Sequence, residues 1–136
     1  MIIQELKDSS NLTQFRFEIE AWIRLIEFLN TENTYYKTRL SQVIDQIQDK
    51  ENLAMAEHFQ NQYIIKDDVY DHFLFSLKEH LQKWKEVQLM KTKEANEEFI
   101  KIQKNLRTRI EFVEKDQMVI SKDFNTFLMA MSLKDL

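Results

Sequence analysis

The groups best able to do chemistry gather in one short segment of the chain. Lys66, Asp67 and Asp68 interrupt an otherwise apolar helical pattern, and His72 follows one helical turn later. Asp68 and His72 are four residues apart, which puts both side chains on one face of a helix. Carboxylates with an imidazole can hold a divalent metal ion. A metal or small-ligand site is therefore one interpretation of this segment.

Other chemistries are excluded by composition. The 136 residues include no Gly, Pro or Cys. Without Gly there is no phosphate-binding loop, dinucleotide-binding turn or nucleophile elbow. Without Cys there is no thiolate zinc site, iron–sulfur cluster or cysteine nucleophile. None of His58, His72 and His80 has an acidic residue three positions before it, so the Glu-x-x-His pattern of di-iron bundles is absent. We assign no catalytic, cofactor or metal residue and expect no enzyme.

The polar segment must be positioned by helices, and the first of these has the clearest pattern. From Leu12 to Ile47, a series of positions spaced alternately three and four residues apart is apolar throughout, apart from Asn33. This spacing forms one stripe along a helix, called the seam here. The seam members are Leu12, Phe15, Ile19, Trp22, Ile26, Leu29, Asn33, Tyr36, Leu40, Val43 and Ile47. We predict an arm over residues 1–10, a cap at Ser10 or Asn11, and a helix over about 12–49.

Two further helices complete the predicted fold. A second helix over about 53–89 carries Tyr63, Tyr70, Leu77 and Trp84 at intervals of seven, after a turn near 48–52 capped by Asn52. A turn near 91–93 leads to a third helix over about 95–120. Its apolar stripe runs through Ile102, Leu106 and Ile110, with a local shift of phase. Residues 122–134 continue it or form a short fourth helix. The prediction is an all-α, single-domain, coiled-coil-like, antiparallel up-down-up bundle of three long helices.

Folding these helices as hairpins places several polar residues at one level. Asn33 then faces residues 66–68, which face residues 114–116. The predicted polar layer comprises Asn33, Lys66, Asp67, Asp68, Lys115 and Asp116, with His72 one turn away. A polar residue in an apolar seam rejects slipped alignments, so a register layer is the favoured interpretation. The metal or ligand site is the alternative.

Charge and hydropathy limit the partners. The net charge is −4, and residues 1–77 hold 7 Lys/Arg against 13 Asp/Glu. Residues 78–115 hold 10 Lys/Arg against 7 Asp/Glu, but these basic and acidic residues alternate as on a solvated helix face. We therefore expect no nucleic-acid partner, with association of nucleic acid through residues 78–115 as the weakest alternative.

No apolar run reaches the roughly 20 residues of a membrane helix. The N-terminus lacks a basic flank, so we expect no signal peptide and predict a cytoplasmic location.

One stretch carries a resemblance. The segment from His58 to Ile65, with Trp22 and Arg39-Leu40, resembles small helical bacterial proteins of unknown function over the first two predicted helices. The resemblance implies a bacterial, cytoplasmic helical bundle and transfers no active site.

The apolar stretch from Phe124 to Leu136 exceeds what three helices need for mutual cover. The favoured function is non-enzymatic protein–protein contact, with a homo-oligomer or another protein as partner. The alternative is a metal- or small-ligand-binding bundle that uses the polar layer.

Overall fold

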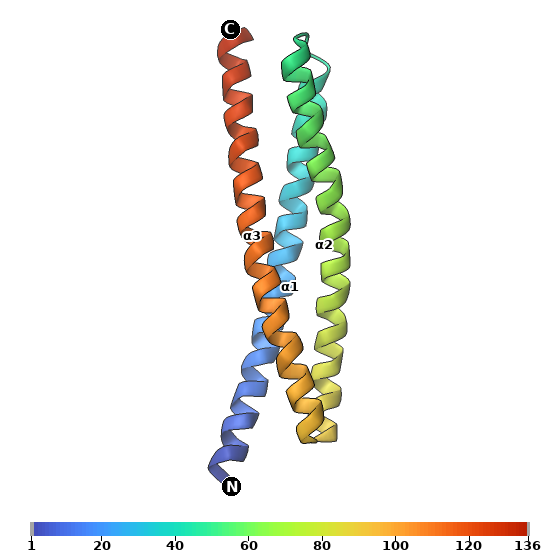
Figure 1. Ribbon diagram of the computed structural model, residues 1–136, viewed down its shortest axis with the longest axis vertical. Helices are drawn as coiled ribbons and strands as arrows, with labels where there is room; N and C mark the ends of the chain where they lie inside the picture. Colours follow the sequence, from blue (N-terminus) through green and yellow to red (C-terminus); the bar gives the residue numbers. More distant parts are fainter. Residues whose placement is uncertain (1, 136) are drawn as a thin grey trace. The chain divides into compact units, whose positions relative to one another are not determined.

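The chain is an all-α protein with three long helices. A computed structural model describes the backbone of residues 2–135 and the side chains of residues 12–131. The helices are α1 (Ile2–Ile44), α2 (Lys50–Met90) and α3 (Lys93–Asp135), each drawn as one continuous ribbon (Figure 1). No strand occurs between residues 2 and 135. The predicted helical bundle is confirmed at this level.

Both ends of α1 differ from the prediction. The helix begins at Ile2, so most of the predicted arm and the predicted cap at Ser10 or Asn11 lie inside it. Nothing in residues 2–11 stops a helix, because the segment contains neither Gly nor Pro. The helix ends at Ile44, before the seam does, and Ile47 packs from the connection against the core. The Leu53 backbone N–H donates to the Asp49 carbonyl at 2.9 Å, and α2 begins at Lys50, so the predicted cap at Asn52 lies inside the helix.

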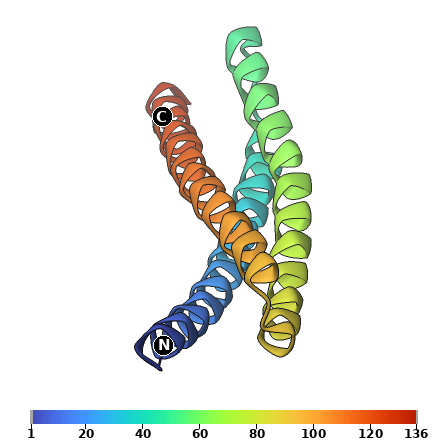
Figure 2. The same ribbon diagram turned by 60° about the horizontal axis from the view of Figure 1, so that its bottom comes forward.

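The second connection is only two residues long and falls where the sequence predicted it. Lys91 has φ of 51°, a left-handed conformation that costs a non-glycine residue about 1 kcal/mol. Its N–H donates to the Val87 carbonyl at 3.1 Å and closes the last turn of α2. The Thr92 hydroxyl then accepts from the Ala95 N–H at 3.2 Å and caps α3. From there α3 runs unbroken to Asp135, so residues 122–134 continue the third helix (Figure 2).

Contacts within the chain group into two compact units, each built from parts of all three helices. Unit 1 comprises residues 1–27 and 71–110, and unit 2 comprises residues 28–70 and 111–136. The single domain stays a prediction, and the units are described separately here. No helix in the part of the chain that the structure describes is both long and apolar enough to cross a membrane, as the sequence predicted.

Each unit has its own apolar core. In unit 2, Phe124 is fully buried and meets the rings of Tyr36, Phe59 and Tyr63 edge-on, with ring centroids 5.3–5.7 Å apart. In unit 1 both tryptophans, Trp22 and Trp84, are buried core residues. Other buried apolar residues of unit 1 are Ile19, Ile26, Phe73, Leu77, Val87, Phe99, Leu106 and Ile110. These cores hold the polar side chains described next.

Candidate functional site

The predicted polar layer is centred on Asn33, a fully buried residue of α1 in unit 2. Its amide nitrogen donates to the Tyr63 carbonyl at 2.8 Å and to the Asp67 carboxylate at 2.7 Å. The Asn33 side-chain oxygen has no hydrogen-bond partner within the protein. The amide therefore joins α1 to α2 through its two N–H groups.

Two ion pairs flank this amide. Lys37, one turn along α1, donates to the other carboxylate oxygen of Asp67. Lys66 is buried and donates to Asp116 of α3, whose side chain is half exposed. The structure thus brings Asn33 to Asp67, and Lys66 to Asp116. Sequence reasoning missed Lys37, although its position four residues after Asn33 places it on the same face of α1.

Two buried phenols extend the layer. The Tyr70 hydroxyl donates to the Gln117 side-chain oxygen of α3 at 2.5 Å. Burial raises the pKa of Tyr70 far above its usual 10.0, and the nearby Asp116 carboxylate raises it further. Burial likewise raises the pKa of Tyr63. Both side chains are therefore neutral at physiological pH, and Tyr70 serves as a hydrogen-bond donor rather than as a base.

The remaining predicted members lie at the surface. Asp68 and Lys115 are exposed. His72 is also exposed and belongs to unit 1, whereas the other members belong to unit 2. Among the residues with described surroundings, no three His, Asp or Glu side chains gather so that they could hold a metal ion. The contacts of the layer join polar groups to one another, which is the arrangement expected of a register layer.

A second polar network lies in unit 1 and was not predicted. Gln103 of α3 is fully buried, and its side-chain nitrogen donates to Glu18 at 2.8 Å and to the Phe15 carbonyl at 3.4 Å. Arg107 holds the same Glu18 carboxylate with two hydrogen bonds of 2.6 and 3.1 Å. The side-chain oxygen of Gln103 lies 2.6 Å from Nε2 of His80. The network links all three helices within the unit.

Gln103 also corrects the predicted stripe of α3. Phe99, Gln103, Leu106 and Ile110 are buried, whereas Ile102 is only half-buried. These positions follow steps of four, three and four, so the predicted shift of phase was wrong. The spacing of three and four residues would have included Gln103, but a stripe defined by apolar residues alone leaves a buried glutamine out.

His80 is the buried titratable group of this network. It is only 3% exposed, and its ring stacks on Phe99 with centroids 4.1 Å apart and an interplanar angle of 10°. Burial lowers the pKa of His80, the hydrogen bond with Gln103 opposes this, and the Lys83 charge lowers it further. The imidazole is therefore neutral at pH 7.

No protein-family model matches the chain, and no match was found among curated proteins or among solved structures.

Proposed function

We propose that the protein works by protein–protein contact, including contact with a second copy of itself, and not by catalysis. The observation that carries the proposal is a set of large apolar side chains on the surface of unit 2. Ile65 and Val69 of α2 are 56% and 42% exposed, and Phe112 and Val119 of α3 are 70% and 60% exposed. Apolar residues exposed together, rather than singly, mark interaction surfaces.

These four residues lie on one side of the pair of helices. Val69 lies three residues after Lys66 and four residues after Ile65 on α2, and Phe112 and Val119 lie four residues before and three residues after Asp116 on α3. The Lys66–Asp116 ion pair joins the two helices at this point. We call Ile65, Val69, Phe112 and Val119 the α2–α3 apolar face. A polar pair beside exposed apolar side chains gives a contact surface both area and orientation.

The C-terminal stretch no longer supplies the argument for self-association. Phe124 is fully buried, Met131 is 6% exposed, and Phe127 and Leu128 pack against the core of unit 2. Side chains beyond Met131 lie outside the described residues. The α2–α3 apolar face is instead the basis for proposing self-association. A second copy is the simplest partner, because an isologous contact buries the same patch on both subunits.

The test compares two equally exposed phenylalanines. Phe112 and Phe75 are both 70% exposed, but Phe75 belongs to unit 1 and lies outside the α2–α3 apolar face. We expect sedimentation velocity at tens of micromolar protein to show a dimer or larger for the parent and for Phe75→Glu. Phe112→Glu should be a monomer, because the contact would bury its charge. A monomeric parent, or equal effects of the two substitutions, would contradict the proposal.

We further propose the antiparallel up-down-up order and a cytoplasmic location, with no nucleic-acid partner. Supporting the helix order, Asn33 and Lys37 both meet Asp67, whereas Leu40, farther along α1, packs in the cluster that contains Phe59. Successive positions on α1 thus meet earlier positions on α2. No observation favours the metal interpretation of the polar layer over the register interpretation.

A further inference from the structure

The α2–α3 apolar face carries an exposed charge beside its apolar residues on each helix. On α2, Asp68 lies three residues after Ile65. On α3, Lys115 lies three residues after Phe112 and four residues before Val119. These spacings place each charge on the same side of its helix as its apolar neighbours. The face thus presents an acidic residue on α2 and a basic residue on α3.

Contacts within unit 2 indicate which residues of α2 and α3 are level. Lys66 pairs with Asp116, and the rings of Phe59 and Phe124 have centroids 5.3 Å apart. With the antiparallel order proposed above, each step forward along α2 is matched by one step back along α3. The acidic residue of the face comes two positions after Lys66 and its basic residue one position before Asp116, so the two charges lie at nearly the same level.

A second copy can cover this face in two limiting ways, which differ in the direction of the two-fold axis. An axis across the helices sets each helix against its own copy. Lys115 lies near the middle of the α3 part of the face, so it would meet Lys115 of the second copy. Like charges placed together across an interface are unfavourable, which disfavours this direction of the axis.

An axis along the helices sets α2 of one copy against α3 of the other and keeps every residue at its level. Lys115 then meets Asp68 of the second copy, so opposite charges come together. By the same count of levels, the two apolar residues of α2 meet the two apolar residues of α3 to within two positions. The charges and the apolar residues of the face are therefore complementary in one and the same arrangement.

We propose that two copies pair about an axis along the helices, with α2 of each copy against α3 of the other and an Asp68–Lys115 ion pair on both sides of the contact. This inference rests on the proposed self-association and names its arrangement. Asp68 also has an interaction within its own chain, and a carboxylate can accept from several donors at once. Ion pairs at the edge of an apolar contact fix its orientation more than they add affinity.

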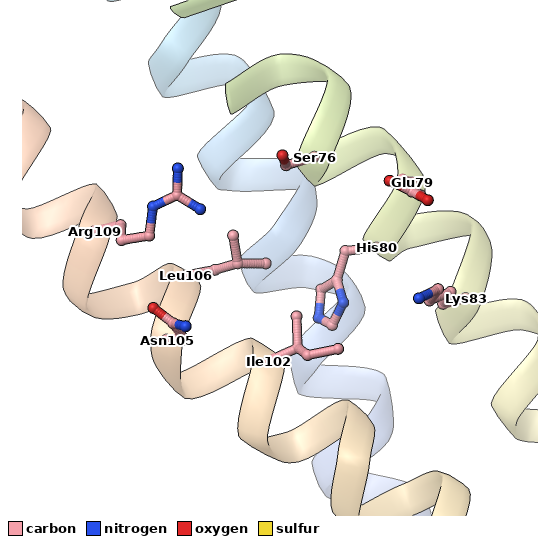
Figure 3. Close-up of a pocket in the computed structure, with 8 residues that line it drawn as sticks. All are labelled: Ser76, Glu79, His80, Lys83, Ile102, Asn105, Leu106 and Arg109. Atoms are coloured by element: carbon pink, nitrogen blue, oxygen red, sulfur yellow. The ribbon is translucent and has the colours of Figure 1, made fainter. Parts of the chain in front are cut away.

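In unit 1 the same two helices present polar side chains instead. Figure 3 shows the cleft that they form there, with Ser76, Glu79 and Lys83 coming from α2 and Asn105 and Arg109 from α3. Such groups give up bound water when another surface covers them, which is unfavourable unless new hydrogen bonds replace it. We therefore expect the pairing to be centred on unit 2.

Charge reversals test the arrangement, with sedimentation velocity as the measurement. Asp68→Lys sets two lysines against each other at both ion pairs, and Lys115→Asp sets two aspartates against each other. We expect each variant to dimerise at least about tenfold more weakly than the parent, because each reversal acts at two symmetry-related places. Glu79→Lys makes the same change of charge at an exposed position of α2 in unit 1 and should dimerise like the parent.

A mixture of the two variants shows that the pairs form between copies. In a dimer of one Asp68→Lys chain and one Lys115→Asp chain, both contacts again join a lysine to an aspartate. The mixture should therefore associate about as tightly as the parent.

Three results would overturn the arrangement while leaving self-association intact. They are single variants that dimerise like the parent, as expected if each helix met its own copy, a mixture as weak as the single variants, and an equal loss for Glu79→Lys and Asp68→Lys. A monomeric parent would overturn both the arrangement and the proposed self-association.

Discussion

Replacing Asn33 by Asp changes the side-chain volume very little, but it puts a hydrogen-bond acceptor in place of a donor at the centre of the polar layer. The Asn33 nitrogen donates to Asp67 at 2.7 Å and to the Tyr63 carbonyl at 2.8 Å. In Asn33→Asp a carboxylate oxygen takes the place of that donor. It would face a second carboxylate and a carbonyl, inside a site with no exposure.

The size of the effect follows from proton binding. A buried charge without a partner costs about 3–5 kcal/mol. The introduced carboxyl can avoid this by binding a proton, which costs about 1.4 kcal/mol for each pH unit above its ordinary pKa near 3.9. At pH 7 this sets a ceiling near 4 kcal/mol. We therefore expect Asn33→Asp to lower the free energy of unfolding by about 3–4 kcal/mol at pH 7.

The sign of the pH dependence is fixed by the same reasoning. The pKa of the introduced carboxyl is raised in the folded state, so that state binds more protons than the unfolded state. The penalty should thus shrink as pH falls, by about 1.4 kcal/mol per unit, or nearly 3 kcal/mol between pH 7 and pH 5. Urea unfolding followed by circular dichroism at both pH values measures this difference.

Two comparisons make the result decisive. Asn61→Asp adds the same charge at an exposed position of α2 and should stay within about 0.5 kcal/mol of the parent. Asn33→Leu loses two hydrogen bonds, but it buries an apolar side chain and removes the unpaired Asn33 oxygen. Its stability should be level or higher. A loss below about 1 kcal/mol for Asn33→Asp, or a loss unchanged at pH 5, would refute the reasoning.

Two further predictions concern the cores. Burial lowers the pKa of His80 below 6.5, so below that pH the unfolded state binds more protons than the folded state. The free energy of unfolding should therefore decrease as the pH is lowered. Urea midpoints at pH 7.5 and 5.5 should show this loss in the parent and a smaller loss in His80→Gln. Phe124→Ala should cost about 3–5 kcal/mol because it empties a fully buried site. Met129→Ala, at a position 68% exposed, should change stability by less than about 0.5 kcal/mol in the same denaturation assay.

The helices and one polar contact could be predicted because both follow from spacing. Steps of three and four specify a helix face, and the short polar segment after Met90 specifies the turn. A hairpin about the first turn then puts Asn33 level with Asp67, where the structure has them bonded at 2.7 Å. The early end of α1 could not be predicted, since Ile47 fits the helical spacing and yet packs from a connection.

The network of unit 1 was missed for a different reason. Apolar periodicity counts a glutamine as an interruption, so the stripe was drawn through Ile102 instead of Gln103. A buried amide is acceptable only where partners meet its hydrogen-bonding groups. Those partners, Glu18 and His80, are far away in sequence and come together only through the fold. The missing information was the pairing of helices, not the residue pattern.

We infer that the buried amides help a chain with repetitive apolar stripes to favour one alignment. Each of Asn33, Gln103 and Gln117 bonds to a partner on α2. A slip of α3 by one heptad would still match apolar residues with apolar residues, but it would set Tyr70 against Ile110 or Phe124. The Tyr70 hydroxyl and the Gln117 side-chain oxygen would then be buried without partners, at about 1–3 kcal/mol each. Apolar contacts thus hold the helices together, and we expect the amides to reject the neighbouring registers.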